Sequence, residues 1–228
     1  GTRANGDYAI QITEDRNVRA YLATINNEND QYNELDSQSV LSEGSWCHIA
    51  LVFNRPDMLL YVNGVEEDRL KVDYPIRHST VPLFIGAEVG SSHFPYEPAN
   101  FFSGTIDEVR ISRISRNSHE IFTSARAGLS LGSGGAEIST NAPHITTNTV
   151  LSYRFEKGTG RIVKDHSPNS ILGSRSGGTI TSTGIFGYAL ELNGSGEYIR
   201  VRDSSDMHLI NATYEFWLKY SQTGDIRY

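Results

Sequence analysis

The stretch SWCHIALVFNRPDMLLYVNGVEEDRL, residues 45–70, decides the fold of this chain. Residues 46–54 and 58–63 read as two strands with period-two patterning, which is typical of strands that bury one face. Asn63-Gly64 then leads into a further run at 65–72, and this dipeptide is the strongest short signal for a β-hairpin. The stretch therefore predicts antiparallel strands joined by tight turns, and the later run GTIDEVRISR (104–113) is expected to close the same sheet.

Strand patterning continues along most of the 228 residues. Further strands are expected at 8–14, 18–25, 81–87, 149–156, 161–165, 188–193, 197–202 and 212–221. One helix is expected over residues 116–126, with Asn117 or Ser118 as its N-cap and Gly128 as its stop. About a dozen short strands and one short helix predict an all-β fold, an antiparallel β-sandwich.

Composition narrows the function classes. Hydrophobic residues make up 38% of the chain, which is enough for a core. The formal net charge of −7 argues against nucleic acid as a partner, since no basic stripe is present to neutralise phosphates. No apolar run approaches the roughly 18 residues that a membrane span requires, so membrane insertion is not expected. Cys47 is the single cysteine and is interpreted as a buried small hydrophobe.

Several segments together resemble the laminin-G-like, concanavalin A-type jelly-roll domains of bacterial and archaeal extracellular proteins. LSYRFEKGTGRIVKDHSPNS (151–170), GYALELNGSGEYIRV (187–201) and YEFWLKYS (214–221) are similar to the first half of such a domain. Trp46–Phe53, Leu60–Gly64 and Gly104–Ile111 are similar to its second half. The resemblance implies a jelly-roll sandwich in an extracellular or cell-surface protein, and one such fold hosts many functions.

The two halves stand in inverted order. Residues 1–126 correspond to the C-terminal half of the sandwich and residues 149–228 to its N-terminal half, with a Gly/Ser/Thr-rich linker at 127–148. Half a sandwich would expose unpaired strand edges and half of a core, so each half needs a complement. The halves can close on each other within one chain, pair with a neighbouring chain, or belong to a tandem array. The order alone leaves these three arrangements open.

Asp107 and Asp165 are the candidate metal ligands, because the resemblance implies a structural Ca²⁺ held by carboxylates at such positions. The alternative is that Asp165 stabilises a turn and Asp107 bonds neighbouring amides at a strand end.

Glycoside hydrolases of similar architecture need carboxylates at alternating positions of one strand. Asp107 and Glu108 are adjacent and are expected to point to opposite faces. The catalytic pattern is therefore absent, and the chain is not expected to be an enzyme.

The loop 91–102 is the candidate ligand-binding segment. His93, Phe94 and Tyr96, spaced by prolines, could stack on a sugar ring or contact a protein. Alternatively, Phe101 and Phe102 anchor the loop in the core and the rest merely packs.

The leading hypothesis is a non-catalytic adhesion or structural-assembly module that forms filaments by head-to-tail completion of half-domains, with itself, other surface proteins or glycans as partners. The alternative is a carbohydrate-binding module of a larger glycan-active or surface protein.

Overall fold

The computed structural model describes residues 6–26, 29–90, 95–129, 144–156 and 160–221. These residues form seventeen strands, one α-helix and one short 3-10 helix, η1 (Ser205–Met207). The strands of the first segment are β1 (Tyr8–Ile12), β2 (Asn17–Asn26), β3 (Asn29–Val40), β4 (Trp46–Asn54), β5 (Asp57–Val62), β6 (Val65–Lys71), β7 (Leu83–Ile85), β8 (Glu88–Val89), β9 (Pro98–Ala99) and β10 (Ser103–Ser112). After helix α1 (Ser118–Leu129) come β11 (Thr149–Tyr153), β12 (Ile162–Val163), β13 (Gly173–Ser176), β14 (Thr179–Gly184), β15 (Gly187–Asn193), β16 (Tyr198–Val201) and β17 (Ala212–Tyr220).

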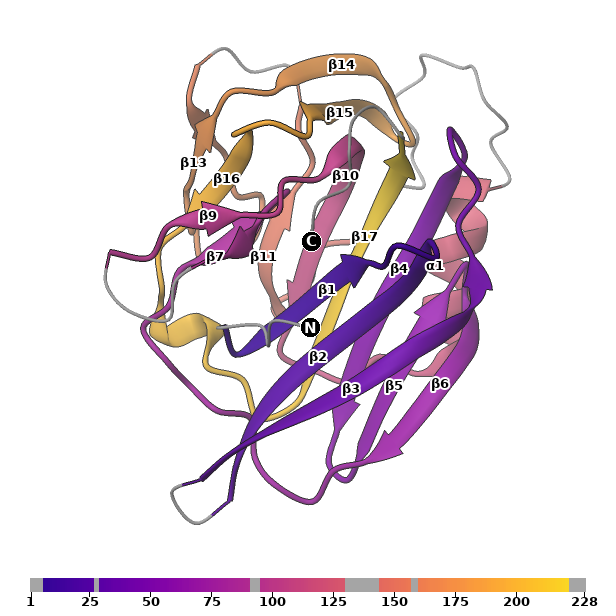
Figure 1. The fold of residues 1–228 in the computed structure, drawn as a ribbon, viewed down its shortest axis with the longest axis vertical. Coiled ribbons are helices and arrows are strands. Elements are labelled where there is room, and N and C mark those ends of the chain that lie inside the picture. Colours follow the sequence, from indigo (N-terminus) through magenta and orange to yellow (C-terminus); the bar gives the residue numbers. More distant parts are fainter. Residues whose placement is uncertain (1–5, 27–28, 91–94, 130–143, 157–159, 222–228) are drawn as a thin grey trace.

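The strands make a two-layered antiparallel sandwich, which confirms the predicted fold class (Figure 1). One layer is an eight-stranded sheet in the order β14-β15-β10-β17-β4-β5-β6, with β11 also paired to β10. The other layer consists of a three-stranded sheet, β1-β2-β3, and a four-stranded sheet, β12-β13-β16-β7. A small pair, β8-β9, lies beside β7. The main hydrophobic core fills the space between the layers.

Strands of the two inverted segments interleave in the eight-stranded sheet. β17 of the second segment lies between β10 and β4 of the first, with Tyr214 paired to Ile111 on one side and to Leu51 on the other. β15 and β11 of the second segment also pair with β10. In the opposite layer β16 pairs with β7, Ile199 opposite Ile85. Both segments therefore contribute strands to each layer.

The Asn63-Gly64 hairpin is formed as predicted, joining β5 to β6 with Val62 opposite Val65. Asn63 and Gly64 have φ of 51° and 82°, which suits a tight hairpin turn that matches strand twist. Gly64 also lies against α1: a Cβ there would be 2.9 Å from the Cα of Phe122. The turn therefore requires glycine both for its backbone conformation and for its close approach to the helix.

Helix α1 covers the outer face of the eight-stranded sheet, where Ile121 packs with Ala50, Val52 and Tyr61 in a second, smaller apolar cluster. The hydrogen bonds at the first turn of α1 confirm Asn117 as the N-cap of the helix. The Asn117 side chain accepts from the Glu120 amide at 3.0 Å, and the Glu120 carboxylate accepts from the Asn117 amide at 2.8 Å.

The predicted stop at Gly128 is wrong, because α1 continues to Leu129. Five strands were also absent from the sequence-based prediction: β3, β8, β9, β13 and β14. β8 and β9 have two residues each, which is too short to show a period. β3 reads NDQYNELDSQSV and β13 and β14 are rich in Gly, Ser and Thr, so none shows a clear alternation of apolar residues. Neighbouring strands supply the pairing that fixes them, as β2 does along nearly all of β3.

Candidate functional site

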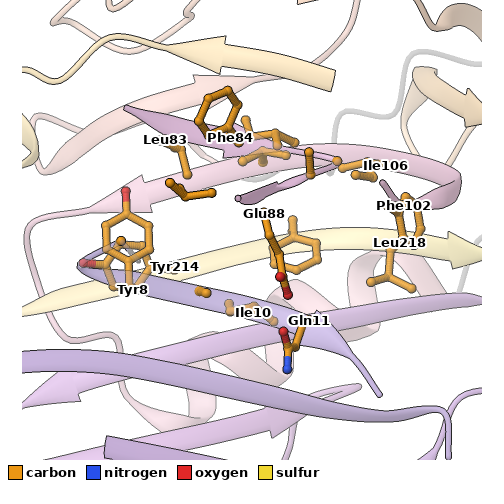
Figure 2. Close-up of a pocket in the computed structure, with 18 of the residues that line it drawn as sticks. Tyr8, Ile10, Gln11, Leu83, Phe84, Glu88, Phe102, Ile106, Tyr214 and Leu218 are labelled. Carbon is orange, nitrogen blue, oxygen red and sulfur yellow. The ribbon is translucent and has the colours of Figure 1, made fainter. Parts of the chain in front are cut away.

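A cavity of about 480 Å³ lies where the second layer is interrupted, between β1 and the β7–β8 segment (Figure 2). Its floor is the inner face of β10 and β17. The lining side chains are mostly apolar, and those drawn and labelled in Figure 2 include Tyr8, Ile10, Leu83, Phe84, Phe102, Ile106, Tyr214 and Leu218. Concave, mainly apolar sites with a few polar groups are the usual form of binding sites in proteins.

Acidic and amide side chains also line this cavity. Glu88 of β8 and Gln11 of β1 extend from the two strand segments that flank it (Figure 2). Glu88 accepts a hydrogen bond from the neutral side-chain amide of Asn100 at 2.8 Å. Asp7 is different, since its carboxylate forms an ion pair with Arg77 at 2.9 Å. The cavity thus combines an apolar floor with a polar, net acidic margin.

Tyr8 and Tyr214 bring the first and second segments together at the cavity. Their ring centroids are 4.1 Å apart with the planes tilted by 31°. Burial raises the pKa of both phenols well above the ordinary value, and the nearby Asp7 raises the pKa of Tyr8 further. Both side chains therefore stay neutral over the physiological range, and they present aromatic surface to the cavity without charge.

Asp165 lies in a dense network of donors. One carboxylate oxygen, Oδ1, accepts from the amides of Ser152 and Ser167, each at 2.8 Å. The other, Oδ2, accepts from the Ser167 hydroxyl at 2.7 Å and from the Ile171 amide at 2.8 Å. Four donors occupy the lone pairs that a cation would need. This geometry matches the turn-stabilising alternative and does not fit a calcium ligand.

Asp107 is also engaged by backbone groups. Its carboxylate accepts from the amides of Glu108 at 2.8 Å, Ile185 at 2.9 Å and Phe186 at 3.2 Å. It thereby ties β10 to the β14–β15 turn. Within the described residues, no group of three or more His, Cys, Asp or Glu side chains could hold a metal ion. These hydrogen bonds argue against a calcium site at Asp107 and Asp165, and a metal titration can test the calcium prediction.

The prediction that Asp107 and Glu108 point to opposite faces is wrong, because β10 contains a bulge at this point. Glu108 has a positive φ of 50°, and Ile106 and Val109 both face the main core although they are three residues apart. Both carboxyls are thus turned away from the main core. Burial raises the pKa of Glu108 to about 8, although Arg154 lies 3.9 Å away.

Beside the bulge, α1 covers a buried ionic network. Arg116 approaches the Glu215 carboxylate to 2.7 Å, and Arg110 bonds the same carboxylate. Arg110 also donates to the carbonyl of His144 at 3.1 Å. These bonds join β10, β17, the residues just before α1 and the described end of the linker. The arrangement has the features of a structural network, since each charge meets an opposite charge or a carbonyl dipole.

The predicted ligand-binding residues are only partly described. His93 and Phe94 lie outside the described residues, and Tyr96 is half-buried next to the β8–β9 pair. Phe102 packs against the main core and lines the cavity, and the Phe101 ring lies 6.2 Å from that of Tyr198. Phe102 therefore anchors the loop as in the alternative interpretation, whereas Phe101 contacts Tyr198 and is not part of the main core. A sugar-binding role for His93, Phe94 and Tyr96 stays a prediction.

The sequence could not reveal the cavity, because residues far apart in the chain line it. The signal that existed was local: YAIQI, residues 8–12, alternates as an amphipathic strand. Among the described residues β1 pairs with one strand, β2, and its other edge borders the cavity. The residues of β1 alone do not show either feature.

The sandwich defines an all-β module of the jelly-roll class, with a mainly apolar cavity between sheet edges. A family model described as the concanavalin A-like lectin/glucanases superfamily, of the laminin G type, matches residues 2–122. The chain therefore belongs to this family, whose laminin-G-like domains are generally non-catalytic binding modules and commonly extracellular. No curated protein and no solved structure matches the chain. The one α-helix among the described residues is too short to cross a membrane.

Proposed function

We propose that this chain is a non-catalytic module for adhesion or structural assembly outside the cell. The observation that carries this proposal is the position of β17, a strand of the second segment, between β10 and β4 of the first. Tyr214 and Leu218 of β17 belong to the main core, together with Ile49 and Leu51 of β4. Removing β17 would expose the inner edges of two long strands and part of the core.

Neither segment can bury its sheet alone, so the two must stay together. They can do so within one chain, or the second segment of one molecule can complete the first segment of the next. The strand pairs are the same in both cases. Exchange of segments between chains therefore loses only the high effective concentration that the linker gives two segments of the same chain. Exchange in one direction is head-to-tail and does not close, which produces filaments.

The experiment is light scattering across a hundredfold range of protein concentration, combined with electron microscopy. We expect species heavier than one chain that grow with concentration, and fibres at the highest concentration. A matched variant carries ten extra Gly and Ser residues inserted between Gly134 and Gly135. A longer tether favours closure within one chain, so this variant should shift toward monomer. Monomers alone at every concentration would contradict the assembly role.

The second candidate is a carbohydrate-binding module. It is supported by the half-buried Tyr96, which is held beside the β8–β9 pair, where an aromatic ring can meet a sugar. A glycan array probed with the parent chain and with Tyr96→Ala tests this role. Binding to specific glycans that the substitution weakens at least tenfold would favour it, and an empty array would argue against it.

A further inference from the structure

We propose that the cavity between β1 and β7 binds one extended peptide strand of a partner protein. The strand would carry apolar side chains at every second position and a basic side chain between them. This inference rests on the proposed function, because it names the ligand class that a binding module of this shape takes. It is carried by the backbone geometry of β1, by the interrupted layer, by the apolar floor and by the acidic margin.

The backbone of β1 has one edge turned away from its partner strand. At the two ends of the β1–β2 pair, Ala23 donates to the carbonyl of Asp7 at 2.7 Å and Thr13 donates to the carbonyl of Asn17 at 2.9 Å. Antiparallel pairs alternate between hydrogen-bonded and non-bonded positions. Asp7, Ala9, Gln11 and Thr13 therefore bond β2, and the N–H and C=O groups of Tyr8, Ile10 and Ile12 point to the opposite side.

That opposite side is the cavity. β1 stands at the end of its three-stranded sheet, and β7 stands at the end of the four-stranded sheet across the gap. Residues 6–12 and 81–89 line the cavity from these two sides. Edge strands of this kind are templates for an added strand, since main-chain hydrogen bonds supply affinity and alternate side chains supply specificity.

The strand counts of the two layers agree with this reading. The described residues place three strands and four strands opposite an eight-stranded sheet. One additional strand between β1 and β7 would join the two smaller sheets into a continuous layer of eight. The cavity is thus the position of one strand, with its floor on β10 and β17.

The floor selects the side chains of the added strand. Ile106 and Leu218 belong to the main core, and Phe102 and Phe216 pack against it from partly buried positions. All four line the cavity. In a strand, every second side chain would point down to this floor and be buried there. Each apolar side chain buried in this way contributes about 1.5–3 kcal/mol before the costs of ordering the peptide.

The acidic margin of the cavity favours a basic side chain at the outward-facing positions of the added strand. Glu88 has a neutral amide, Asn100, as its hydrogen-bond partner, and Gln11 lies on the other flank. A Lys or Arg that points outward from the added strand would meet this carboxylate (Figure 2). The chain's net charge of −7 adds a long-range preference for a basic peptide.

The test uses the full chain and an acetylated, amidated peptide, TIRITK. Nuclear magnetic resonance with amide exchange reports on each residue of β1. The amides of Tyr8, Ile10 and Ile12 should gain protection at least tenfold on peptide addition. Those of Ala9 and Gln11 already bond β2, so they serve as internal references and should change little.

Three comparisons make the result decisive. A peptide of the same composition without alternation, TTIIRK, should bind at least tenfold more weakly, as should TIRITK methylated on its backbone nitrogens. Glu88→Gln should weaken binding several-fold, whereas Glu14→Gln, an exposed position in the β1–β2 turn, should not. Unchanged exchange at Tyr8, Ile10 and Ile12 with saturating peptide would overturn the proposal.

Two other occupants are separate outcomes of the same experiment. If a chain shortened to residues 1–221 binds the peptide and the full chain does not, the cavity belongs to the chain's own segment 222–228. If a small apolar dye binds in the cavity and the peptide does not displace it, the ligand is a small molecule. Either outcome overturns the proposal. Neither touches the assembly role, which light scattering tests independently.

Discussion

Gly128 of α1 lies directly against the indole of Trp217 on β17. A Cβ at position 128 would be 2.3 Å from Cζ2 and 2.6 Å from Cη2 of that ring, which is closer than real contacts allow. Trp217 is 1% exposed, and its ring meets that of His48 edge-on at a centroid distance of 5.1 Å. The absence of a side chain at position 128 therefore sets how closely the helix approaches the sheet.

Gly128→Ala should destabilise the protein although alanine is the better helix former. Alanine gains about 1 kcal/mol in helix propensity, but forcing a methyl group into a packed contact costs about 1–3 kcal/mol. We expect a net loss of up to about 2 kcal/mol in the free energy of unfolding, measured by urea denaturation. Thr123→Ala, at an exposed position of the same helix, should change it by less than about 0.5 kcal/mol. Unchanged or increased stability of Gly128→Ala would contradict this account of the contact.

Features with local signals were predictable from the sequence. The Asn63-Gly64 turn, the strands around it and the Asn117 cap each depend on residues a few positions apart. Gly128 is different, since its role depends on Trp217, which lies in the other segment. The prediction of a helix stop followed the usual place of glycine and could not include a distant indole ring.

Features that depend on tertiary pairing were missed for the same reason. β3 is largely polar, and its pairing with β2 is supported by contacts such as the 2.6 Å ion pair between Arg19 and Asp36. The bulge at Glu108 reverses the facing that simple alternation implies. The cavity joins Tyr8 to Tyr214 across the whole chain. The alternation of apolar residues predicts which face of a strand is buried, but it does not show which edge of a sheet lacks a neighbouring strand.

Asp165→Asn should be strongly destabilising. The carboxylate receives four donors, and an amide would present two donors of its own to some of them. Losing bonds to a charged acceptor costs about 1.5–3 kcal/mol each before relaxation, so a total loss of at least about 2 kcal/mol is expected in urea denaturation. Asp73→Asn, at an exposed position, provides the matched control. A variant as stable as the parent chain would show that this network is dispensable.

Calcium should not change the melting temperature of the parent chain. The lone pairs of Asp165 are occupied and Asp107 accepts three backbone amides, so neither side chain fits a cation ligand in this geometry. Differential scanning calorimetry with 5 mM calcium and then with excess chelator checks this expectation. A rise of several degrees with calcium that chelator reverses would restore the calcium hypothesis and require other oxygen ligands.

Stability should depend on pH through His48. Burial, with a smaller contribution from Arg116, lowers its pKa from 6.5 to about 4, against the opposing effect of Glu215. The folded state therefore disfavours the protonated ring, while the unfolded chain binds the proton near pH 6.5. Stability from this group is fully present above pH 6.5 and is lost as the pH falls toward 4. Between pH 7 and pH 5 the loss should be up to about 2 kcal/mol.

His48→Gln tests this linkage through a slope, so its own effect on stability does not matter. Urea denaturation at pH 7 and pH 5 should show a smaller loss in the variant than in the parent chain. His119→Gln, at an exposed position on α1, should retain the parent slope. Equal slopes in all three proteins would show that His48 does not titrate between the folded and unfolded states as proposed.

The thiol of Cys47 should report on whether β4 and β17 separate. Cys47 is 6% exposed, and it lies opposite Leu218 in the pair that joins the two segments. Burial raises its pKa to about 12, so little thiolate forms near pH 8. Labelling by a disulfide reagent should be roughly a thousandfold slower in the native protein than in guanidinium, from the thiolate fraction alone. Labelling and exchange of segments between chains both require this strand pair to open, so neither should be faster than that opening. Rapid stoichiometric labelling of the native protein would show instead that the two segments part easily.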